Sequence, residues 1–307
     1  MLRRRSALSL FIFFGLFAAA AISHSANCAS PQTSPPAATK TLLHTARSSP
    51  LDLELAGDLA GLPPGSVRYL TRDDLLTLPR VNYTVTGDAN LAASTQVRGV
   101  ALDILVDQFA ADPEKAMAIA VCDDLYRAHY SRAYLKAHRP SLVLEINGQP
   151  PANWPKSKDG SGSSMAPYLI SHPLFTPSFK ILGHQDKAQI PWGVVRLEFR
   201  NEEALLRSIA PRGPTATDVP VQAGYAIAQQ NCWRCHAPQS EGPRKGKLTW
   251  EGIALFASAS PPTFSNYVRN PQKVAPSAEM PANPTYDDAT MRALVSYFRT
   301  FFPQDKP

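Results

Sequence analysis

The chain has 307 residues, a formal net charge of +6 at pH 7, four cysteines and 29 prolines. This charge is too small to indicate nucleic acid as a partner, because binding to a phosphate backbone calls for dense clusters of lysine and arginine. The length exceeds that of a typical single domain and predicts two domains. The many prolines indicate loops and extended linkers.

The N-terminus has the pattern of a secretory signal peptide. Three arginines at positions 3–5 precede an apolar run over residues 7–22 that ends among small residues. We expect cleavage near Ala26, so residues 1–26 form the signal peptide and the charge falls from +6 by three to +3. An uncleaved anchor is the alternative, although the run is shorter than the about 20 residues that span a bilayer. The mature chain is expected to be periplasmic or otherwise exported, without a membrane span.

Two proline-rich segments divide the rest of the chain. Residues 27–50 are rich in Pro, Ser, Thr and Ala and predict an extended linker. Residues 209–220 contain three prolines and a glycine and predict a second linker between domains. We therefore expect one domain over residues 51–208 and another over residues 221–307.

The first of these domains mixes strand and helix patterns. Residues 51–57 place leucines on alternate positions, as in a half-buried strand. Thr71 begins a short helix that stops before Pro79, and residues 99–110 predict a second helix. Further strands are expected over residues 81–87, 116–122, 141–148 and 192–199. The pattern predicts an α+β domain with a mixed sheet.

A basic segment of the same domain covers residues 127–139. It holds His129 and His138 together with four arginines or lysines. We interpret it as a solvated helix face; a site for a cofactor phosphate or a metal is the alternative.

The second domain has the pattern of an all-α fold. Apolar and small residues from Val221 to Cys235 recur at spacings of three and four, on one stripe of a helix. Further helices are expected over residues 249–259, 262–271 and about 287–302, with an extended loop over residues 270–286.

The segment NCWRCHAPQ, residues 231–239, contains Cys232, Cys235 and His236 in the pattern Cys-x-x-Cys-His. This is the attachment pattern of c-type haem. Two thiols one helical turn apart can form thioether bonds to the two vinyl groups of one porphyrin edge. The adjacent histidine then reaches the iron as an axial ligand. We therefore predict one covalent haem c on these residues.

Two other uses of such cysteines, a redox pair and a zinc site, fit the sequence less well. A thioredoxin-like redox pair belongs at the start of a helix that follows a strand, whereas Cys232 and Cys235 come at the end of an amphipathic helix. A zinc site needs two more cysteine or histidine ligands at suitable spacing, and none follows His236.

A six-coordinate iron needs a second axial ligand, and methionine is the remaining candidate. Only Met280 and Met291 follow the motif. Met291 lies in the apolar stripe of the last helix and is expected in the core. Met280 lies in a proline-flanked loop, from which its thioether can reach the iron, so we predict His236 and Met280 as the axial pair.

Residues 218–303 resemble class I cytochrome c. The resemblance rests on GYAIAQQNCWRCH (224–236), Gly242-Pro243, FSNYVRNP (264–271), Met280-Pro281 and a last helix with LVSYF. It implies a monohaem electron carrier in which Gly224 permits a close helix crossing, facing Leu294 and Tyr297.

The same resemblance implies further contacts of the haem. The carbonyl of Pro243 would accept a hydrogen bond from Nδ1 of the axial histidine and so orient the imidazole. Tyr267 and Trp250 are candidates for contacts with the haem or its propionates, with ordinary core packing as the alternative for each.

Residues 50–205 resemble the molybdopterin-binding domain of sulfite oxidase-like proteins, through LTRDDLLTLP (70–79), RGVALDIL (98–105), CDDLY (122–126) and EINGQPP (145–151). The sequence departs from the pattern of this family at specific positions. The cysteine that binds molybdenum in the family precedes the second of these segments, yet residues 50–121 contain no cysteine. Leu125 replaces a glycine of the family's D-G-Y turn. Cys122 is expected to be a small buried residue. We therefore expect the scaffold without molybdopterin.

These observations predict an exported electron-transfer protein rather than an enzyme. The α+β domain would dock a redox partner protein, a dehydrogenase or an oxidase, or act as a scaffold. One alternative is a haem-containing molybdopterin oxidoreductase that acts on a small oxo-substrate. Another is a haem sensor with a displaceable distal ligand.

Overall fold

The computed structural model describes residues 43–157 and 162–302. The expected signal peptide and most of the expected linker over residues 27–50 lie outside the described residues. Within the described ranges, no helix is long and apolar enough to cross a membrane.

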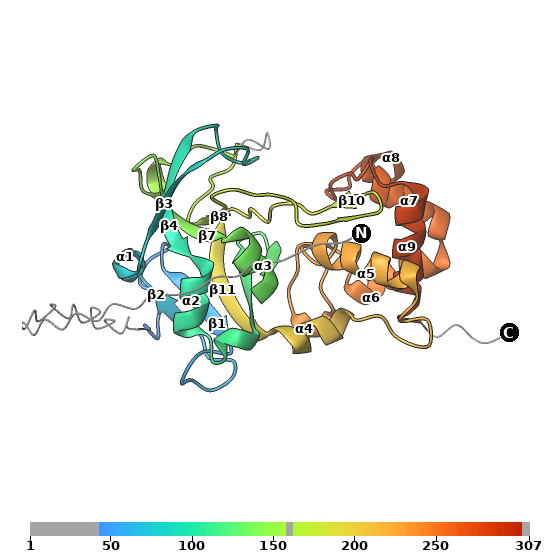
Figure 1. The fold of residues 1–307 in the computed structure, drawn as a ribbon, viewed down its shortest axis with the longest axis horizontal. Coiled ribbons are helices and arrows are strands. Elements are labelled where there is room, and N and C mark those ends of the chain that lie inside the picture. Colours follow the sequence, from blue (N-terminus) through green and yellow to red (C-terminus); the bar gives the residue numbers. More distant parts are fainter. Residues whose placement is uncertain (1–42, 158–161, 303–307) are drawn as a thin grey trace, which may run out of the picture. The chain divides into compact units, whose positions relative to one another are not determined.

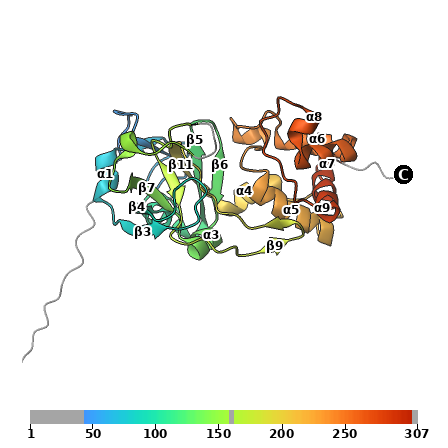
Figure 2. The same cartoon turned by 90° about the horizontal axis from the view of Figure 1, so that it is seen from above.

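The α+β region contains a mixed five-stranded sheet in the order β2-β1-β11-β5-β6 (Figures 1 and 2). Strand β1 pairs in parallel with β11, and the other pairs are antiparallel. The five strands are β1 (Leu53–Gly57), β2 (Arg68–Leu70), β5 (Ala116–Cys122), β6 (Arg127–Tyr130) and β11 (Val194–Asn201). The expected mixture of strands and helices, with a mixed sheet, is confirmed.

A second, antiparallel sheet has the order β3-β4-β7-β8, and a separate two-stranded hairpin follows it in the chain. The sheet consists of β3 (Val81–Val85), β4 (Thr95–Ala101), β7 (Ser141–Ile146) and β8 (Leu169–Ser171), and the hairpin of β9 (Lys180–Ile181) and β10 (His184–Gln185). Buried side chains of both sheets and of the neighbouring helices form one apolar core.

Four short helices accompany these strands: α1 (Arg72–Thr77), α2 (Leu102–Phe109), α3 (Arg132–His138) and α4 (Glu202–Ile209). Thr71 caps α1 through a reciprocal pair of hydrogen bonds with Asp74. The helix expected over residues 99–110 begins only at Leu102, because Gly99 and the two residues after it pair with β7. Single 3₁₀ turns lie at Pro113–Lys115, Pro151–Asn153 and Gln239–Glu241.

The basic segment over residues 127–139 is not one solvated helix. It divides into strand β6, all of whose residues are buried, and helix α3, which Ser131 caps. Arg127, His129 and His138 are each at most 7 % exposed. The charge pattern was misleading because Arg127 forms an ion pair with Glu198 of β11 in the same sheet, at 3.0 Å between Nη2 and Oε2.

The C-terminal region is helical, as expected, and its helices gather together in both views (Figures 1 and 2). They are α5 (Val219–Asn231), α6 (Trp250–Ala259), α7 (Pro261–Arg269), α8 (Pro271–Val274) and α9 (Asp288–Arg299). Helices α5 and α9 cross closely at Gly224, where a Cβ atom would lie 2.1 Å from the carbonyl oxygen of Ala293 and 2.8 Å from Cβ of Tyr297. The predicted role of Gly224 is confirmed, with Ala293 rather than Leu294 at the nearest approach.

Strand β5 joins the two regions through its two faces. Ala118, Ala120 and Cys122 belong to the core of the α+β region. Met117, Ile119 and Val121 point to the opposite face and share a core with helices α5, α6 and α9. The described residues accordingly lie in one compact unit, residues 41–307.

Candidate haem site

The two cysteines lie in a tight turn at the end of helix α5. Cys232 is the C-cap residue, and its N–H donates to the carbonyl of Ala228 at 2.8 Å. The N–H groups of Cys235 and His236 then both donate to the carbonyl of Cys232, at 3.2 and 3.0 Å. These bonds hold the motif as one turn, with the two thiols about one helical turn apart.

Two adjoining cavities lie beside this turn, with volumes of about 260 and 250 Å³. Both are lined by Cys235, His236, Tyr267 and Met280, and Cys232 lines the first. The first cavity has apolar walls from helices α6 and α7, namely Ile253, Phe256, Phe264 and Val268. The fold therefore brings the predicted thioether and axial residues together around one apolar space.

The imidazole of His236 is oriented for binding through Nε2. Its Nδ1 lies 2.8 Å from the carbonyl oxygen of Leu248. A carbonyl can only accept, so Nδ1 must carry the hydrogen and Nε2 keeps its lone pair. Burial lowers the pKa of His236, which favours this neutral form. The loop fits tightly against the ring, because a Cβ atom on Gly246 would lie 2.5 Å from Nδ1.

The predicted acceptor for this hydrogen bond was wrong. The carbonyl that receives Nδ1–H belongs to Leu248, not to Pro243. The N–H of Gly246 donates to the carbonyl of Cys235 at 2.7 Å and folds the loop back over the imidazole. The fold of this loop brings the carbonyl of Leu248 to the ring. Leu248 lies two residues before helix α6 and five positions beyond Pro243.

Met280 lies in the loop between α8 and α9 and lines both cavities. Its side chain is half-buried and packs against the helical core. The side-chain amide of Gln272, in α8, donates to the carbonyls of Ala278 and Met280 at 2.9 and 3.0 Å and holds the loop. Met291, by contrast, is 3 % exposed within the core around α9, as expected.

The two aromatic candidates differ in position. Tyr267 lines both cavities. Trp250 is fully buried at the start of α6 and lines neither cavity; its indole N–H donates to the hydroxyl of Tyr297 at 3.1 Å. The core interpretation therefore holds for Trp250, whereas Tyr267 is placed for a contact with a bound haem.

The thiols do not have the environment of a redox pair. Burial raises the pKa of Cys232 to about 12 and also raises the pKa of Cys235. Reactive dithiols have lowered pKa values, usually at a helix N-terminus, whereas Cys232 caps a C-terminus. Among the described residues, no three His, Cys, Asp or Glu side chains form a group that could hold a metal ion. The donor set of two thiols, one imidazole and one thioether around an apolar cavity fits a c-type haem.

The α+β region contacts the motif, which the sequence did not reveal. The N–H of Arg127 in β6 donates to the carbonyl of Arg234 at 2.8 Å. The imidazole of His129 stacks on the indole of Trp233, with ring centroids 3.9 Å apart. Beside the motif, Lys245 forms an ion pair with Asp124. These contacts join the α+β region to the residues around the Cys-x-x-Cys turn.

The α+β region does not offer the ligand expected for molybdenum. Cys122 ends β5, is 3 % exposed and belongs to the apolar core, and burial strongly raises its pKa. Leu125 has a φ of 68°, the left-handed conformation for which glycine is favoured. The turn therefore keeps a backbone suited to glycine although the glycine itself is absent.

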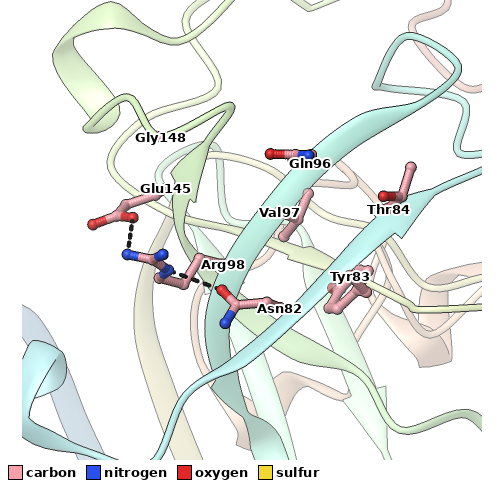
Figure 3. A pocket seen from close by; sticks show the side chains of 8 residues that line it. All are labelled: Asn82, Tyr83, Thr84, Gln96, Val97, Arg98, Glu145 and Gly148. Carbon is pink, nitrogen blue, oxygen red and sulfur yellow. Dashed lines mark hydrogen bonds and ion pairs between the residues drawn. The ribbon is translucent and has the colours of Figure 1, made fainter.

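A cavity of about 350 Å³ lies over strands β3, β4 and β7 (Figure 3). Its charged side chains satisfy each other. Arg98 donates from Nε to the side-chain oxygen of Asn82 at 2.8 Å and pairs with Glu145 at 3.1 Å (Figure 3). The described residues that line it include no cysteine.

Comparison with known proteins agrees with the haem site. Residues 219–298 match the model of the family described as cytochrome C oxidase, cbb3-type, subunit III. The C-terminal region is therefore a c-type cytochrome domain, whose cofactor is haem c and whose activity is electron transfer with a redox partner. No curated protein matches the chain. The resemblance of residues 50–205 to sulfite oxidase-like proteins stays a prediction.

Proposed function

We propose that the protein is an exported monohaem c-type cytochrome that carries single electrons and that uses its α+β region as a scaffold and docking surface for a redox partner. The observation that carries the proposal is the hydrogen bond from Nδ1 of His236 to Leu248, which leaves Nε2 free beside a cavity that Met280 also lines.

The residues around the cavities would have two roles, covalent attachment of the haem and coordination of its iron. Cys232 and Cys235 would hold the haem covalently, and His236 and Met280 would occupy both axial positions. When bound, the haem supplies a one-electron iron couple. With both positions filled by protein atoms, the site would exchange electrons without binding a substrate at the iron. The methionine sulfur would raise the reduction potential relative to a second nitrogen ligand.

Positive side chains beside the cavities support the docking of an acidic partner surface. Lys187 and Arg234 line the first cavity. Lys247 lines the second together with Glu279 and with Lys245, which pairs with Asp124. Lys187 comes from the α+β region, so both regions would contribute to the approach of a partner. Charges at the rim of an interface act mainly on the rate of encounter.

The alternative function, a molybdopterin oxidoreductase with an attached cytochrome, has less support. The described part of the α+β region offers the buried Cys122 as its one thiol. An enzyme of this kind would contain stoichiometric molybdenum beside iron. Metal analysis of the purified exported protein should find iron alone.

Paired methionine variants test the axial assignment. Met280→Ala should convert the iron to a high-spin form that binds carbon monoxide without denaturation, because the sixth ligand is lost. Met291→Ala removes a buried side chain of the same type, so it should leave the visible spectrum unchanged and lower the free energy of unfolding by about 2–5 kcal/mol. Visible absorption and carbon monoxide titration of both variants give the answer.

Carbon monoxide binding by the unmodified protein would contradict the filled axial position and favour a sensor. An unchanged low-spin spectrum in Met280→Ala would contradict the choice of ligand.

A further inference from the structure

A separate cavity of about 280 Å³ lies on the other side of the haem-attachment turn. Strands β5 and β6, helix α3, hairpin strand β9 and helix α5 all contribute to its walls. Trp233, between the two haem-binding cysteines, also lines it. The cavity therefore lies between the α+β region and the cytochrome domain, and it shares none of the axial residues.

Two buried side chains of this cavity, His129 and Trp233, have polar atoms without a hydrogen-bond partner among the described residues, and His129 has two such atoms. His129 is 7 % exposed, and neither ring nitrogen has a hydrogen-bond partner among the described residues. The ring lines the cavity and stacks on Trp233, so a ligand in the cavity would lie beside an imidazole with two unsatisfied nitrogens. Leaving a buried polar group without a hydrogen bond is unfavourable, so a partner for it would be strongly favoured.

The neighbouring polar groups are already paired. The side chain of Gln189 bonds the backbone N–H and C=O of His129 at 3.0 and 2.8 Å. The hydroxyl of Tyr134 accepts from the N–H of Gln189 at 2.9 Å and lies 3.0 Å from Nε2 of His172. The amide of Gln230 bonds Asp186 and His184. These groups hold the walls and leave the imidazole of His129 available.

The electrostatics of the cavity exclude a charged ligand. No Asp, Glu, Lys or Arg is among the described residues that line it. Burial, reinforced by the positive charges of Arg127 and Arg234, holds the pKa of His129 well below its ordinary value. The ring is therefore neutral, with one donor and one acceptor nitrogen. A charged ligand would lose its hydration without gaining a counter-charge.

The remaining walls favour a flat apolar body. Trp233 and Phe179 are aromatic, and Met117 and Ile181 are apolar. A thioether packs well against aromatic rings. Phe179 is 37 % exposed and lies at the solvent side of the cavity.

We propose that this cavity binds a small uncharged hydroxy-aromatic compound, whose hydroxyl bonds the imidazole of His129 and whose ring packs between Trp233, Phe179 and Met117. A hydroxyl suits the site because it can both donate to and accept from a neutral imidazole. The assignment does not depend on the axial ligands of the haem.

Phenol is a suitable probe, and NMR of the reduced holoprotein labelled with ¹⁵N-histidine is a suitable measurement. Titration with phenol should shift the ring nitrogens of His129 saturably. His129→Phe keeps an aromatic ring on Trp233 but removes both nitrogens, and should weaken binding by about tenfold, the equivalent of one hydrogen bond. The matched control His44→Phe changes an exposed histidine of the α+β region and should leave the affinity unchanged.

A second variant keeps His129 intact. Ala226 lines the cavity from helix α5, so Ala226→Leu should fill part of it and abolish phenol binding while the ring signals of His129 persist. Benzoate, which is charged, should bind more weakly than phenol by tenfold or more.

A non-saturating shift, or equal affinities in the unmodified protein and in Ala226→Leu, would overturn the proposal and leave the cavity as a water-filled space. Visible spectra recorded on the same samples report the haem separately, so failure of the cavity site is distinguishable from failure of the proposed electron-transfer function.

Discussion

The α+β region and the cytochrome domain bury their polar side chains in different ways. In the α+β region, buried charges have partners close by: Arg127 pairs with Glu198, and His138 lies 3.3 Å from the carboxylate of Asp186. In the cytochrome domain, His236 and Met280 line a cavity, and their free ends face space rather than partners.

This difference separates groups that hold a fold from groups that are prepared for a ligand. A buried ion pair satisfies itself, so it gives little indication of a site. An imidazole whose Nδ1 is held by a carbonyl beside a cavity leaves Nε2 available for a ligand. In the α+β region, neither ring nitrogen of the buried His129 has a hydrogen-bond partner among the described residues.

We expect the largest effect from a substitution at Gly224, where helices α5 and α9 of the cytochrome domain cross closely. Gly224→Val would push a side chain into the backbone carbonyl of Ala293, so we expect the cytochrome domain to lose its folded form, at a cost of about 3 kcal/mol or more. Far-UV and visible circular dichroism of the exported protein would measure the loss.

Gly252→Ala is the matched control. Its new Cβ atom would meet neighbours only at 3.4 Å, and alanine favours the helix by up to about 1 kcal/mol. Unfolding curves in which both glycine variants behave alike would contradict the close crossing.

A second test concerns the buried histidines of the α+β region. Burial, followed by the neighbouring His138, lowers the pKa of His172 to about 3 from an ordinary value of 6.5. The folded protein keeps this ring neutral while the unfolded chain takes up a proton. The contribution of the neutral His172 to the free energy of unfolding is therefore complete above pH 6.5, and it is lost as the pH falls toward 3. Between pH 6 and pH 4 the loss from this group is about 2–3 kcal/mol.

Denaturant unfolding at several pH values would measure this dependence. His172→Gln should flatten it. An equally steep dependence in His172→Gln would show that the ring does not titrate as described.

The smallest expected effect concerns the turn at Leu125. This residue has a φ of 68° and is 39 % exposed, so its side chain contributes little burial while its backbone is strained. Leu125→Gly should raise the free energy of unfolding by about 1 kcal/mol, because glycine adopts this conformation freely. Thermal unfolding provides the measurement. A destabilised variant would mean that packing of the leucine outweighs the strain.

The haem site could be predicted from the sequence because its chemistry is concentrated within short stretches. Cys232, Cys235 and His236 are adjacent, and a methionine beside a proline in a loop is a local pattern. The hydrogen-bond acceptor for His236 could not be predicted in the same way. Several loop carbonyls follow the motif, and the turn at Gly246 decides which of them reaches the ring.

The contact between His129 and Trp233 could not be predicted either, because it joins segments far apart in the chain. One feature of the sequence did indicate that the two regions pack together. Residues 116–122, AMAIAVC, are apolar throughout, and a strand without alternation is buried on both faces. Strand β5 accordingly packs on the α+β core with one face and on the cytochrome domain with the other. Strand β6 (Arg127–Tyr130) was not predicted, because its segment is basic. The partner charge of Arg127, Glu198, lies far along the chain in β11.

Intact mass spectrometry of the exported chain under denaturing conditions tests the haem assignment most directly. Covalent attachment predicts the mass of the mature chain plus one haem, and loss of this added mass when Cys232 and Cys235 are both replaced by alanine. A chain that carries no added haem mass after export from cells competent for haem attachment would contradict the assignment of this site.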